Sequence, residues 1–317
     1  MSSGIPIQSK IKRVSILTLQ NMKKRGEIIC ASSIYDAQTA RLFDQARVQI
    51  ADGAGNEKEV GGDLIIVGDS AAMAVQGRQN TLPMTMDEMI RFCQAVRRGT
   101  ERLFIVGDMP LGSYEVSDED AVRNAMRFMK EVEPACDAVK LETNMAYVRR
   151  IKAIADACLV VAHIGLNPNK AAMLGGYRTQ GKTRASLDEL KRVLDAVQEA
   201  GACIILAESV TEEIMQILKP RVNSEIPFMG IAAGRNLDGQ LVISSDLLGL
   251  YPWPGNPPVH FEQYRTERQG ITVGEATLDA FKWYVKAVKE KMFPRDKHVH
   301  HLPEGELRHI LENESIE

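Results

Sequence analysis

Short, continuous apolar runs recur along the chain, and a segment of helical character separates each run from the next. Runs of this length without polar alternation are typical of parallel strands that are buried on both faces. The pattern predicts eight strands, of which the eighth is the least distinct. They lie at residues 27–33, 63–69, 103–109, 138–143, 159–165, 203–209, 227–233 and 239–245.

The segments between the runs contain helix start signals. The sequence TMDE at 85–88 has the spacing of a capping box, and SLDE at 186–189 repeats it, with Gly201 as a C-terminal cap for the second helix. Ser117 precedes three acidic residues, which suits the positive end of a helix dipole. A last helix is predicted at 275–292.

Eight strand–helix units in series predict an α/β fold, a single-domain (β/α)8 TIM barrel. The alternative is an open doubly wound sheet, but no GxGxxG loop supports it. The sequence GYRTQGKT at 176–183 matches the Walker pattern, yet no strand leads directly into it, so we interpret the match as chance. Residues 1–292 are predicted to form the barrel with an N-terminal arm. Residues 293–317 form a polar tail rich in His and Glu, typical of a mobile end.

Composition narrows the class of protein. The net charge of −3 over 317 residues gives no general basic surface for nucleic acid, and we interpret Lys10, Lys12 and Arg13 as a solvated arm. No apolar run approaches the roughly 18 residues of a membrane span, and the first ten residues have no apolar core of a signal peptide. The five cysteines include no CxxC pair. We therefore expect a cytoplasmic protein without membrane or nucleic-acid partners.

Two of the predicted strands end in the same way, on a glycine followed by an aspartate. These are Gly68-Asp69 and Gly107-Asp108. In a barrel of this kind the active site lies at the carboxyl ends of the strands, so both carboxylates would lie at that rim. Strand alternation would place Asp69 on the face of Ile65 and Val67, and the glycines leave room for close approach.

The next three strands also end in ionisable groups. Lys140 and Glu142 share one face of the fourth strand, the fifth strand provides His163, and the sixth provides Glu208. A buried strand should not contain two charges unless they are paired or used. Each residue has a structural alternative: a helix cap for an aspartate, an ion pair for Lys140 and Glu142, a core histidine for His163. Five convergent strand ends favour a functional pocket.

Two aspartates with water form a hard-oxygen site, which favours Mg²⁺ over zinc. Such a cation could chelate a substrate with adjacent carboxylate and keto oxygens and stabilise an enolate. Lys140 would add positive charge near the same anion, and Glu208 could serve as the base. The residues alone therefore predict metal-assisted chemistry next to a carbonyl group and no particular substrate.

Ordered motifs between about residues 20 and 250 resemble the ketopantoate hydroxymethyltransferase family, and the terminal FPRDKHVHH resembles it more weakly. The matching segments are YDAQTARLFDQA, VGDSAAM, TLPMTMDEMI, AVRRG, VGDMPLGSY, VKLE, AHIGLNP, LGGYRTQGKT, GIAAGRNLDGQ and DLLGL. The resemblance implies a (β/α)8 barrel with a Mg²⁺ site. It also implies hydroxymethyl transfer from 5,10-methylenetetrahydrofolate to 3-methyl-2-oxobutanoate, giving 2-dehydropantoate in pantothenate biosynthesis, in a homo-oligomer that is often a decamer.

The resemblance also assigns roles to individual residues. It implies that Asp69 and Asp108 bind the metal, with Glu142 acting through water. The residues implied to hold or line the site of the 2-oxoacid are Ser70, Lys140 and His163. It implies that Glu208 is the catalytic base.

The chain departs from the family pattern at several positions. Residues 47–62 are inserted in the link between a helix and the next strand, so we expect them on the face away from the site. Ser244-Ser245 precedes Asp246 where the family usually has His, Thr143-Asn144 replaces glycines, and Ala162 replaces a glycine before His163. The sequence beyond His301 is extra.

These departures leave three alternatives open. The chain could be a paralogue acting on another 2-oxoacid, or a folate-independent Mg²⁺ barrel lyase that acts on a C–C bond. It could also be a non-catalytic barrel, against which the five intact ionisable residues argue.

Overall fold

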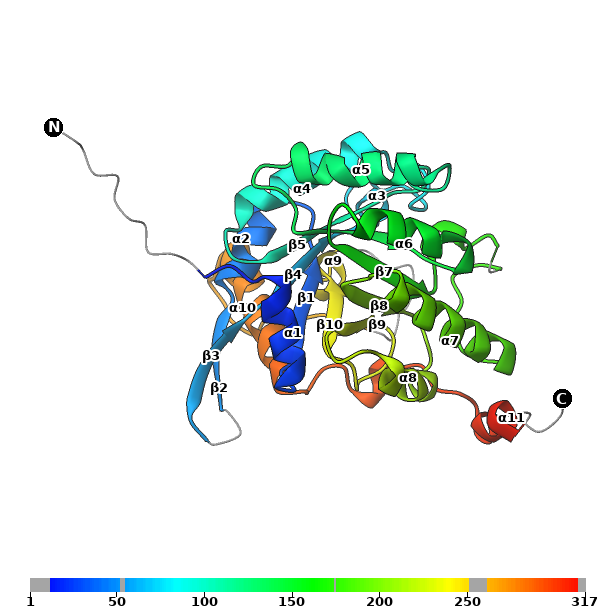
Figure 1. The fold of residues 1–317 in the computed structure, drawn as a ribbon. Coiled ribbons are helices and arrows are strands. Elements are labelled where there is room, and N and C mark those ends of the chain that lie inside the picture. The colour runs from blue at the N-terminus through cyan, green and yellow to red at the C-terminus, as the bar shows by residue number, and fades with distance from the viewer. Residues whose placement is uncertain (1–11, 52–54, 174, 251–260, 313–317) are drawn as a thin grey trace.

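The structure is a computed structural model that describes residues 12–51, 55–173, 175–250 and 261–312. Eight parallel strands close into a barrel in the order β1-β10-β9-β8-β7-β6-β5-β4 (Figure 1). The predicted fold class and all eight predicted strands, including the least distinct one, are confirmed. The strands are β1 (Ile29–Ser33), β4 (Leu64–Val67), β5 (Phe104–Asp108), β6 (Ala138–Glu142), β7 (Val160–Gly165), β8 (Ile204–Glu208), β9 (Phe228–Ile231) and β10 (Gly239–Ile243).

Alternate residues of the strands fill the barrel interior. One buried cluster takes side chains from all eight strands but only from the first helix, α1 (Ile16–Lys24), which closes the amino-terminal end with Leu19 and Met22. The strand members of this interior row are Ile29, Ala31, Leu64, Ile66, Phe104, Val106, Ala138, Val161, Ile204, Leu206, Met229, Ile231 and Leu241. The same in–out alternation continues to the carboxyl ends of the strands, where the side chains that point into the barrel are polar.

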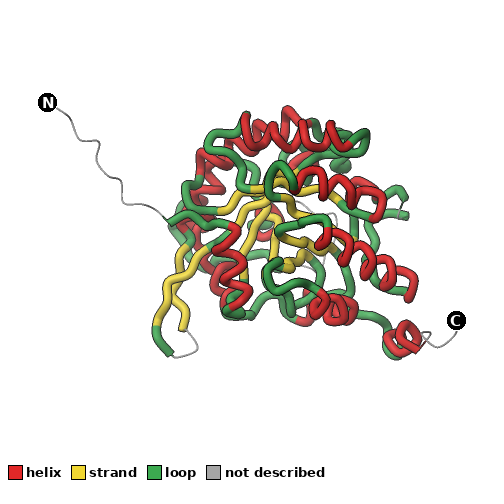
Figure 2. Tube along the Cα trace, viewed as in Figure 1, coloured by secondary structure: helices red, strands yellow, loops and turns green. Residues whose placement is uncertain are grey.

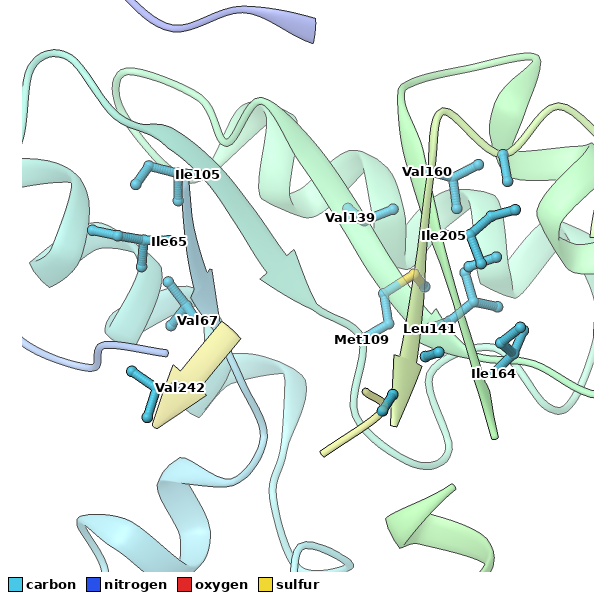
Figure 3. Close-up of a cluster of buried hydrophobic side chains, with 14 of the residues drawn as sticks. Ile65, Val67, Ile105, Met109, Val139, Leu141, Val160, Ile164, Ile205 and Val242 are labelled. Carbon is cyan, nitrogen blue, oxygen red and sulfur yellow. The ribbon is translucent and has the colours of Figure 1, made fainter. Parts of the chain in front are cut away.

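The opposite face of each strand packs against the surrounding helices (Figure 2). Figure 3 shows part of this outer core, including Ile65, Val67 and Ile105 from neighbouring strands. Gly107 belongs to this face: a Cβ there would lie 2.4 Å from the ring of Phe128, so the glycine allows close helix packing. The α-helices after α1 are α2 (Ala37–Gln45), α3 (Ala71–Ala74), α4 (Met86–Gly99), α5 (Asp118–Lys130), α6 (Val148–Ala155), α7 (Arg184–Glu199), α8 (Glu212–Leu218), α9 (Ser244–Leu247), α10 (Val273–Lys289) and α11 (Glu306–Glu312).

Helix starts agree with the sequence patterns at two of three predicted positions. Thr85 and Glu88 form a reciprocal capping box for α4, and the Ser117 side chain caps α5. The predicted start of α7 at Ser186 is wrong, because Thr183 caps the helix and Ser186 completes the box one turn earlier than expected. Gly201 follows α7 with φ of +98°, as a C-terminal cap requires.

Removing the hydroxyl that caps α4 should destabilise the fold. Thr85→Ala leaves the backbone N–H of Glu88 without its side-chain acceptor, so we expect the free energy of unfolding to fall by about 0.5–2 kcal/mol. Thr39→Ala is the matched control, because Thr39 lies in the first turn of α2, where the side chain of Asp36 is the cap. Denaturant unfolding measures both. Equal free energies of unfolding in the two variants would contradict the role of the cap.

The inserted segment forms an antiparallel hairpin, β2 (Arg47–Ala51) and β3 (Glu57–Gly61), that the sequence pattern did not predict. It extends at the end of the barrel that α1 covers (Figure 1). Lys58 pairs with Glu27, which lies between α1 and β1, and α10 packs on both hairpin strands. The insertion therefore lies away from the carboxyl ends of the barrel strands, as expected.

The first part of the C-terminal segment, residues 293–301, packs on the barrel, although its composition is that of a polar tail. Phe293 is buried and contacts the rings of both Tyr284 of α10 and His298, which is also buried. The carbonyl of His300 accepts the backbone N–H of Glu212, and the side chains of Glu213 and His301 pair at 2.7 Å. Composition alone was misleading because this polar segment contains apolar side chains that are buried and ionisable side chains that form pairs with the barrel.

Two smaller expectations concern the ends and the surface. Lys10 lies outside the described residues, whereas Lys12 and Arg13 are exposed, and Arg13 pairs with Asp137. In the described part of the chain, no helix has the length and apolar character needed to cross a membrane. All five cysteines are free.

Candidate active site

A cavity of about 500 Å³ opens at the carboxyl ends of the barrel strands. All seven residues proposed from the sequence line it, which brings together side chains that are up to 139 positions apart in the chain. They are Asp69, Ser70, Asp108, Lys140, Glu142, His163 and Glu208. The floor is apolar, formed by Ile66, Leu206, Ile231, Leu241 and Ile243.

Asp69 reaches the cavity by a different route from the one that strand alternation predicts. β4 ends at Val67, whose side chain faces the helices, and the chain then turns at Gly68. The backbone N–H of Asp69 donates to Oδ2 of Asp108 at 3.0 Å, and this bond holds the turn against β5. A Cβ on Gly68 would lie 2.7 Å from Oγ of Ser70, so a larger residue there would displace the Ser70 hydroxyl.

A buried row of polar contacts runs across three neighbouring strands. Nζ of Lys140 lies 2.8 Å from Oδ1 of Asp108 and 3.2 Å from Nδ1 of His163. An ammonium group can only donate, so Nδ1 of the neutral imidazole must be the acceptor and the ring proton lies on Nε2. That nitrogen is 3.2 Å from Oε2 of Glu208, although it is not aligned for a good hydrogen bond.

The sequence interpretation missed Asn169, which joins two of the carboxylates. Its side-chain amide donates to Oδ2 of Asp69 at 2.8 Å, and its backbone N–H lies 3.0 Å from Oε1 of Glu142. Thr81 donates to the amide oxygen of Asn169 and so fixes the orientation of the amide. Asn169 lies in a short 3-10 turn after β7 rather than at a strand end, so only its place just beyond the motif AHIGLNP could have indicated it.

Ser70 faces the cavity beside the aspartates and accepts or donates a hydrogen bond with the hydroxyl of Tyr35 at 2.8 Å. Burial raises the pKa of Tyr35, so this hydroxyl keeps its proton over the ordinary pH range. Tyr35 follows β1, which is the neighbour of β4 in the barrel. The pair therefore fixes the Ser70 hydroxyl at the edge of the carboxylate cluster.

Burial dominates the electrostatics of the cluster. It raises the pKa of Asp69 to about 8, helped by the neighbouring Asp108 charge and opposed by Lys140. It raises the pKa of Glu142 to about 9, against the effect of Lys140. Burial lowers the pKa of Lys140, but Asp108, Asp69 and Glu142 raise it more, so the ammonium stays charged. Burial also lowers the pKa of His163, and Lys140 adds to this, so the imidazole is neutral at pH 7.

The donor set fits a hard divalent cation. Asp69 and Asp108 adjoin each other, and Glu142 lies nearby on β6. Among the described residues that line the cavity, Lys140 provides the one ammonium that balances their charge. The raised pKa values of Asp69 and Glu142 mean that these two groups gain from a proton or a cation. Carboxylate oxygens have several lone pairs each, so the hydrogen bonds described above leave positions for a metal.

A second acidic group is a poorer place for a metal. Among the described residues, Glu212, Asp296 and His301 bring one ligand atom each within 4.8 Å of the others. Arg235 already pairs with Glu212 at 2.6 Å and with Asp296 at 3.2 Å. A guanidinium therefore occupies the position of the cation, and we interpret this group as an ion-pair network that holds the C-terminal segment.

Backbone strain also concentrates at the cavity. Ser209 and Ala232 have φ values of +49° and +53°, which are uncommon for residues with a Cβ, and both line the cavity. Ser209 directly follows Glu208, so its conformation helps to set where that carboxylate lies. His300 of the C-terminal segment also reaches the cavity wall.

A parallel barrel with carboxylates, an ammonium and an imidazole gathered at the carboxyl ends of its strands is an enzyme of the (β/α)8 class. Residues 13–296 match the family described as Ketopantoate hydroxymethyltransferase. The chain therefore belongs to the ketopantoate hydroxymethyltransferase family, a family of transferase enzymes, as its motifs predicted.

Two relatives illustrate the similarity. The 3-methyl-2-oxobutanoate hydroxymethyltransferase of Alkaliphilus metalliredigens is 42% identical over 292 residues, which cover 92% of this chain and 94% of the relative. The protein of the same name from Emericella nidulans is 37% identical over 300 residues and covers 93% and 78% of the two chains.

Solved structures with the same fold are more distant in sequence. A 2,3-dimethylmalate lyase of the PEP mutase/isocitrate lyase superfamily has a TM-score of 0.52 at 15% identity, covering 75% of this chain and 80% of the lyase. An oxaloacetate acetylhydrolase has a TM-score of 0.52 at 12% identity and covers 90% and 99%. These likenesses confirm the barrel fold.

Proposed function

We propose that the enzyme transfers a hydroxymethyl group from 5,10-methylenetetrahydrofolate to C3 of 3-methyl-2-oxobutanoate and so forms 2-dehydropantoate. One observation supports this most: the cavity has paired aspartates and a lysine on one side and a carboxylate, Glu208, on another strand. The first group suits an anionic 2-oxoacid, and the second suits removal of its proton. The names of the relatives point to the same substrate.

Mg²⁺ is the proposed cofactor. Asp69 and Asp108 would hold it directly and Glu142 through water, in keeping with their oxygen donors and their burial. When bound, the cation supplies a Lewis acid for the carboxylate and keto oxygens of the substrate. Asn169 would position two of the three carboxylates, because its side chain and its backbone bond to Asp69 and Glu142.

Lys140 and Ser70 are the proposed anion-binding groups. Two of the three ammonium N–H bonds of Lys140 are directed to Asp108 and His163, which leaves one for a bound oxygen. Charge-assisted hydrogen bonds of this kind are strong in a buried site. His163 would line the pocket and orient Lys140 and Glu208, since it lies between them.

Glu208 is the proposed base. Its side chain is the most exposed of the proposed ionic groups and faces the cavity from the end of β8. It would take the proton from C3, and the electron pair left behind forms the enolate that the cationic side stabilises. The methylene carbon of the donor then loses both of its bonds to nitrogen and gains one bond to C3 and one to the oxygen of water. The proton from C3 and the remaining proton of water end on the two nitrogens of tetrahydrofolate, which leaves.

A binding screen tests the substrate. Calorimetry with a series of 2-oxoacids, each with and without Mg²⁺, should show Mg²⁺-dependent binding that is tightest for 3-methyl-2-oxobutanoate. Tighter binding of another 2-oxoacid would assign the chain to a paralogue, in keeping with its altered residues around Ser244 and Thr143. Free cysteines fit the reducing cytoplasm that we propose as its location.

A homo-oligomer is proposed as well. The hairpin lies at the amino-terminal end of the barrel, and a two-stranded hairpin is only marginally stable by itself. We expect light scattering at micromolar concentration to give a mass larger than that of a dimer. A monomer mass under these conditions would contradict the proposal.

A further inference from the structure

A second polar edge of the cavity lies at the end of β10. Ser245 and Asp246 belong to the short helix α9 and line the cavity, with exposed fractions of 8% and 5%. The hydroxyl oxygen of Ser245 is buried and has no hydrogen-bond partner in the described part of the chain. A buried hydroxyl without a partner costs free energy, so its place beside the cavity points to a ligand.

The hydroxyl has no role in forming the local backbone. The carbonyls of Ser244, Ser245 and Asp246 accept the N–H groups of Leu248, Leu250 and Gly249, at 2.9, 2.8 and 3.1 Å. Among the described residues, no side chain caps α9 by a hydrogen bond. A purely structural explanation for Ser245 would need such a bond.

The position separates Ser245 from the residues of β6, whereas β10 is two strands from β4, after which Asp69 and Ser70 lie. In the closed order of the strands, β10 is four steps from β6 in either direction, so Ser245 lies across the barrel from Lys140 and Glu142. A ligand anchored at Lys140 by its carboxylate would need to span the cavity to reach Ser245. The cavity of about 500 Å³ falls in the range of roughly 300–1,000 Å³ that holds drug-sized ligands, which leaves room beyond a five-carbon acid.

Charge selects the kind of group that fits. A carboxylate at this edge would repel the anionic end of a 2-oxoacid but would accept hydrogen bonds from N–H donors. A hydroxyl beside it can donate or accept. An aminopyrimidinone ring, such as that of a reduced pterin, presents adjacent N–H donors and a carbonyl in one plane. The apolar floor, including Leu241 and Ile243 of β10, offers a surface for the face of such a ring.

We propose that Ser245 and Asp246 bind the N–H edge of the donor's pterin ring and thereby hold the one-carbon unit over the enolate. The inference rests on the proposed function, because it requires a folate donor. It separates the cavity into an acid-binding side on β4 to β6 and a donor-binding side on β10.

The test compares two half-reactions in the same variants. Ser245→Ala should raise the KM for 5,10-methylenetetrahydrofolate about three- to tenfold, the usual effect of one neutral hydrogen bond. Asp246→Asn should raise it about ten- to a hundredfold, because the bonds to a charged acceptor are stronger. In both variants the KM for the 2-oxoacid and its Mg²⁺-dependent C3 deuterium exchange, which needs no folate, should stay within about twofold of wild type. Ser244→Ala is the matched control, because Ser244 is buried in the same helix but does not line the cavity.

The possible outcomes separate the two proposals. Unchanged donor KM in both variants, or an altered acid KM and exchange rate in place of the donor KM, would overturn the donor-binding assignment. Absence of transfer by the wild-type protein would reject the proposed function, and this assignment with it. Calorimetric binding of tetrahydrofolate, weakened in Ser245→Ala but not in Ser244→Ala, gives support that does not depend on turnover.

Discussion

Glu208→Gln should slow the exchange of the C3 hydrogen of 3-methyl-2-oxobutanoate for deuterium by about 10²- to 10⁴-fold, the usual contribution of a general base. Glutamine keeps the shape and the hydrogen-bonding capacity of the side chain but cannot accept a proton as a carboxylate does. The exchange needs the protein, Mg²⁺ and D₂O but no folate, because the enolate forms before the one-carbon unit is added. NMR of the C3 signal over time measures the rate.

The competing explanation is that Glu208 only pairs with His163, from which it is 3.2 Å away. In that case Glu208→Gln would weaken binding or lower stability, while the protein that still binds would keep its exchange rate. Calorimetric binding of Mg²⁺ and the 2-oxoacid separates the two explanations. Glu213→Gln is the control, since Glu213 lies outside the cavity. Exchange at the wild-type rate in well-folded Glu208→Gln protein would assign the base to another group.

Asp69→Asn and Asp108→Asn should each lose Mg²⁺-dependent binding of the 2-oxoacid by at least about 100-fold. Mutation of a residue that only orients a metal ligand lowers metal affinity by up to about 100-fold. Removal of a ligand itself should therefore lower the affinity by at least as much. Asp156→Asn, at an exposed position, is the control. Calorimetry measures the Mg²⁺-dependent affinity for the 2-oxoacid. An unchanged affinity in both variants would contradict the proposal that Asp69 and Asp108 bind the metal.

The two variants should differ in stability, which gives an independent check of the geometry. Asp108 is the direct partner of Lys140, so Asp108→Asn leaves a buried ammonium with weaker compensation, and breaking such a pair typically costs about 3–5 kcal/mol. Asp69 has a raised pKa because it is buried and lies next to Asp108, so its ionised form is unfavourable and a neutral asparagine should cost the fold little. We expect Asp69→Asn to unfold at wild-type or higher denaturant concentration and Asp108→Asn at a lower one.

The barrel could be predicted from the sequence because its strands are buried on both faces. Each strand therefore appears as a short apolar run, and the charges that interrupt these runs lie where the strands end. Lys140 and Glu142 show this most clearly, since two charges in a buried strand require a partner or a function. The site residues proposed from this reasoning all line one cavity.

Features that depend on tertiary contacts could not be predicted in this way. Asn169 acts through a turn that brings its backbone to Glu142, and nothing in the local sequence fixes that approach. β3 is mostly charged, and β2 alternates only at Val48 and Ile50, which is too short a pattern to identify a strand. Ser245 was recognised only as a departure from a family motif, because the absence of a partner for its hydroxyl is a property of the folded cavity.

The most direct test of the proposed function is to follow the one-carbon unit itself. The protein is incubated with 3-methyl-2-oxobutanoate, Mg²⁺ and 5,10-methylenetetrahydrofolate labelled with ¹³C at the methylene carbon, and the 2-oxoacids are analysed by mass spectrometry. We predict 2-dehydropantoate heavier by one ¹³C, formed only when the protein, Mg²⁺ and the donor are all present. Absence of labelled 2-dehydropantoate under conditions in which the protein binds Mg²⁺ and the 2-oxoacid would contradict the proposal.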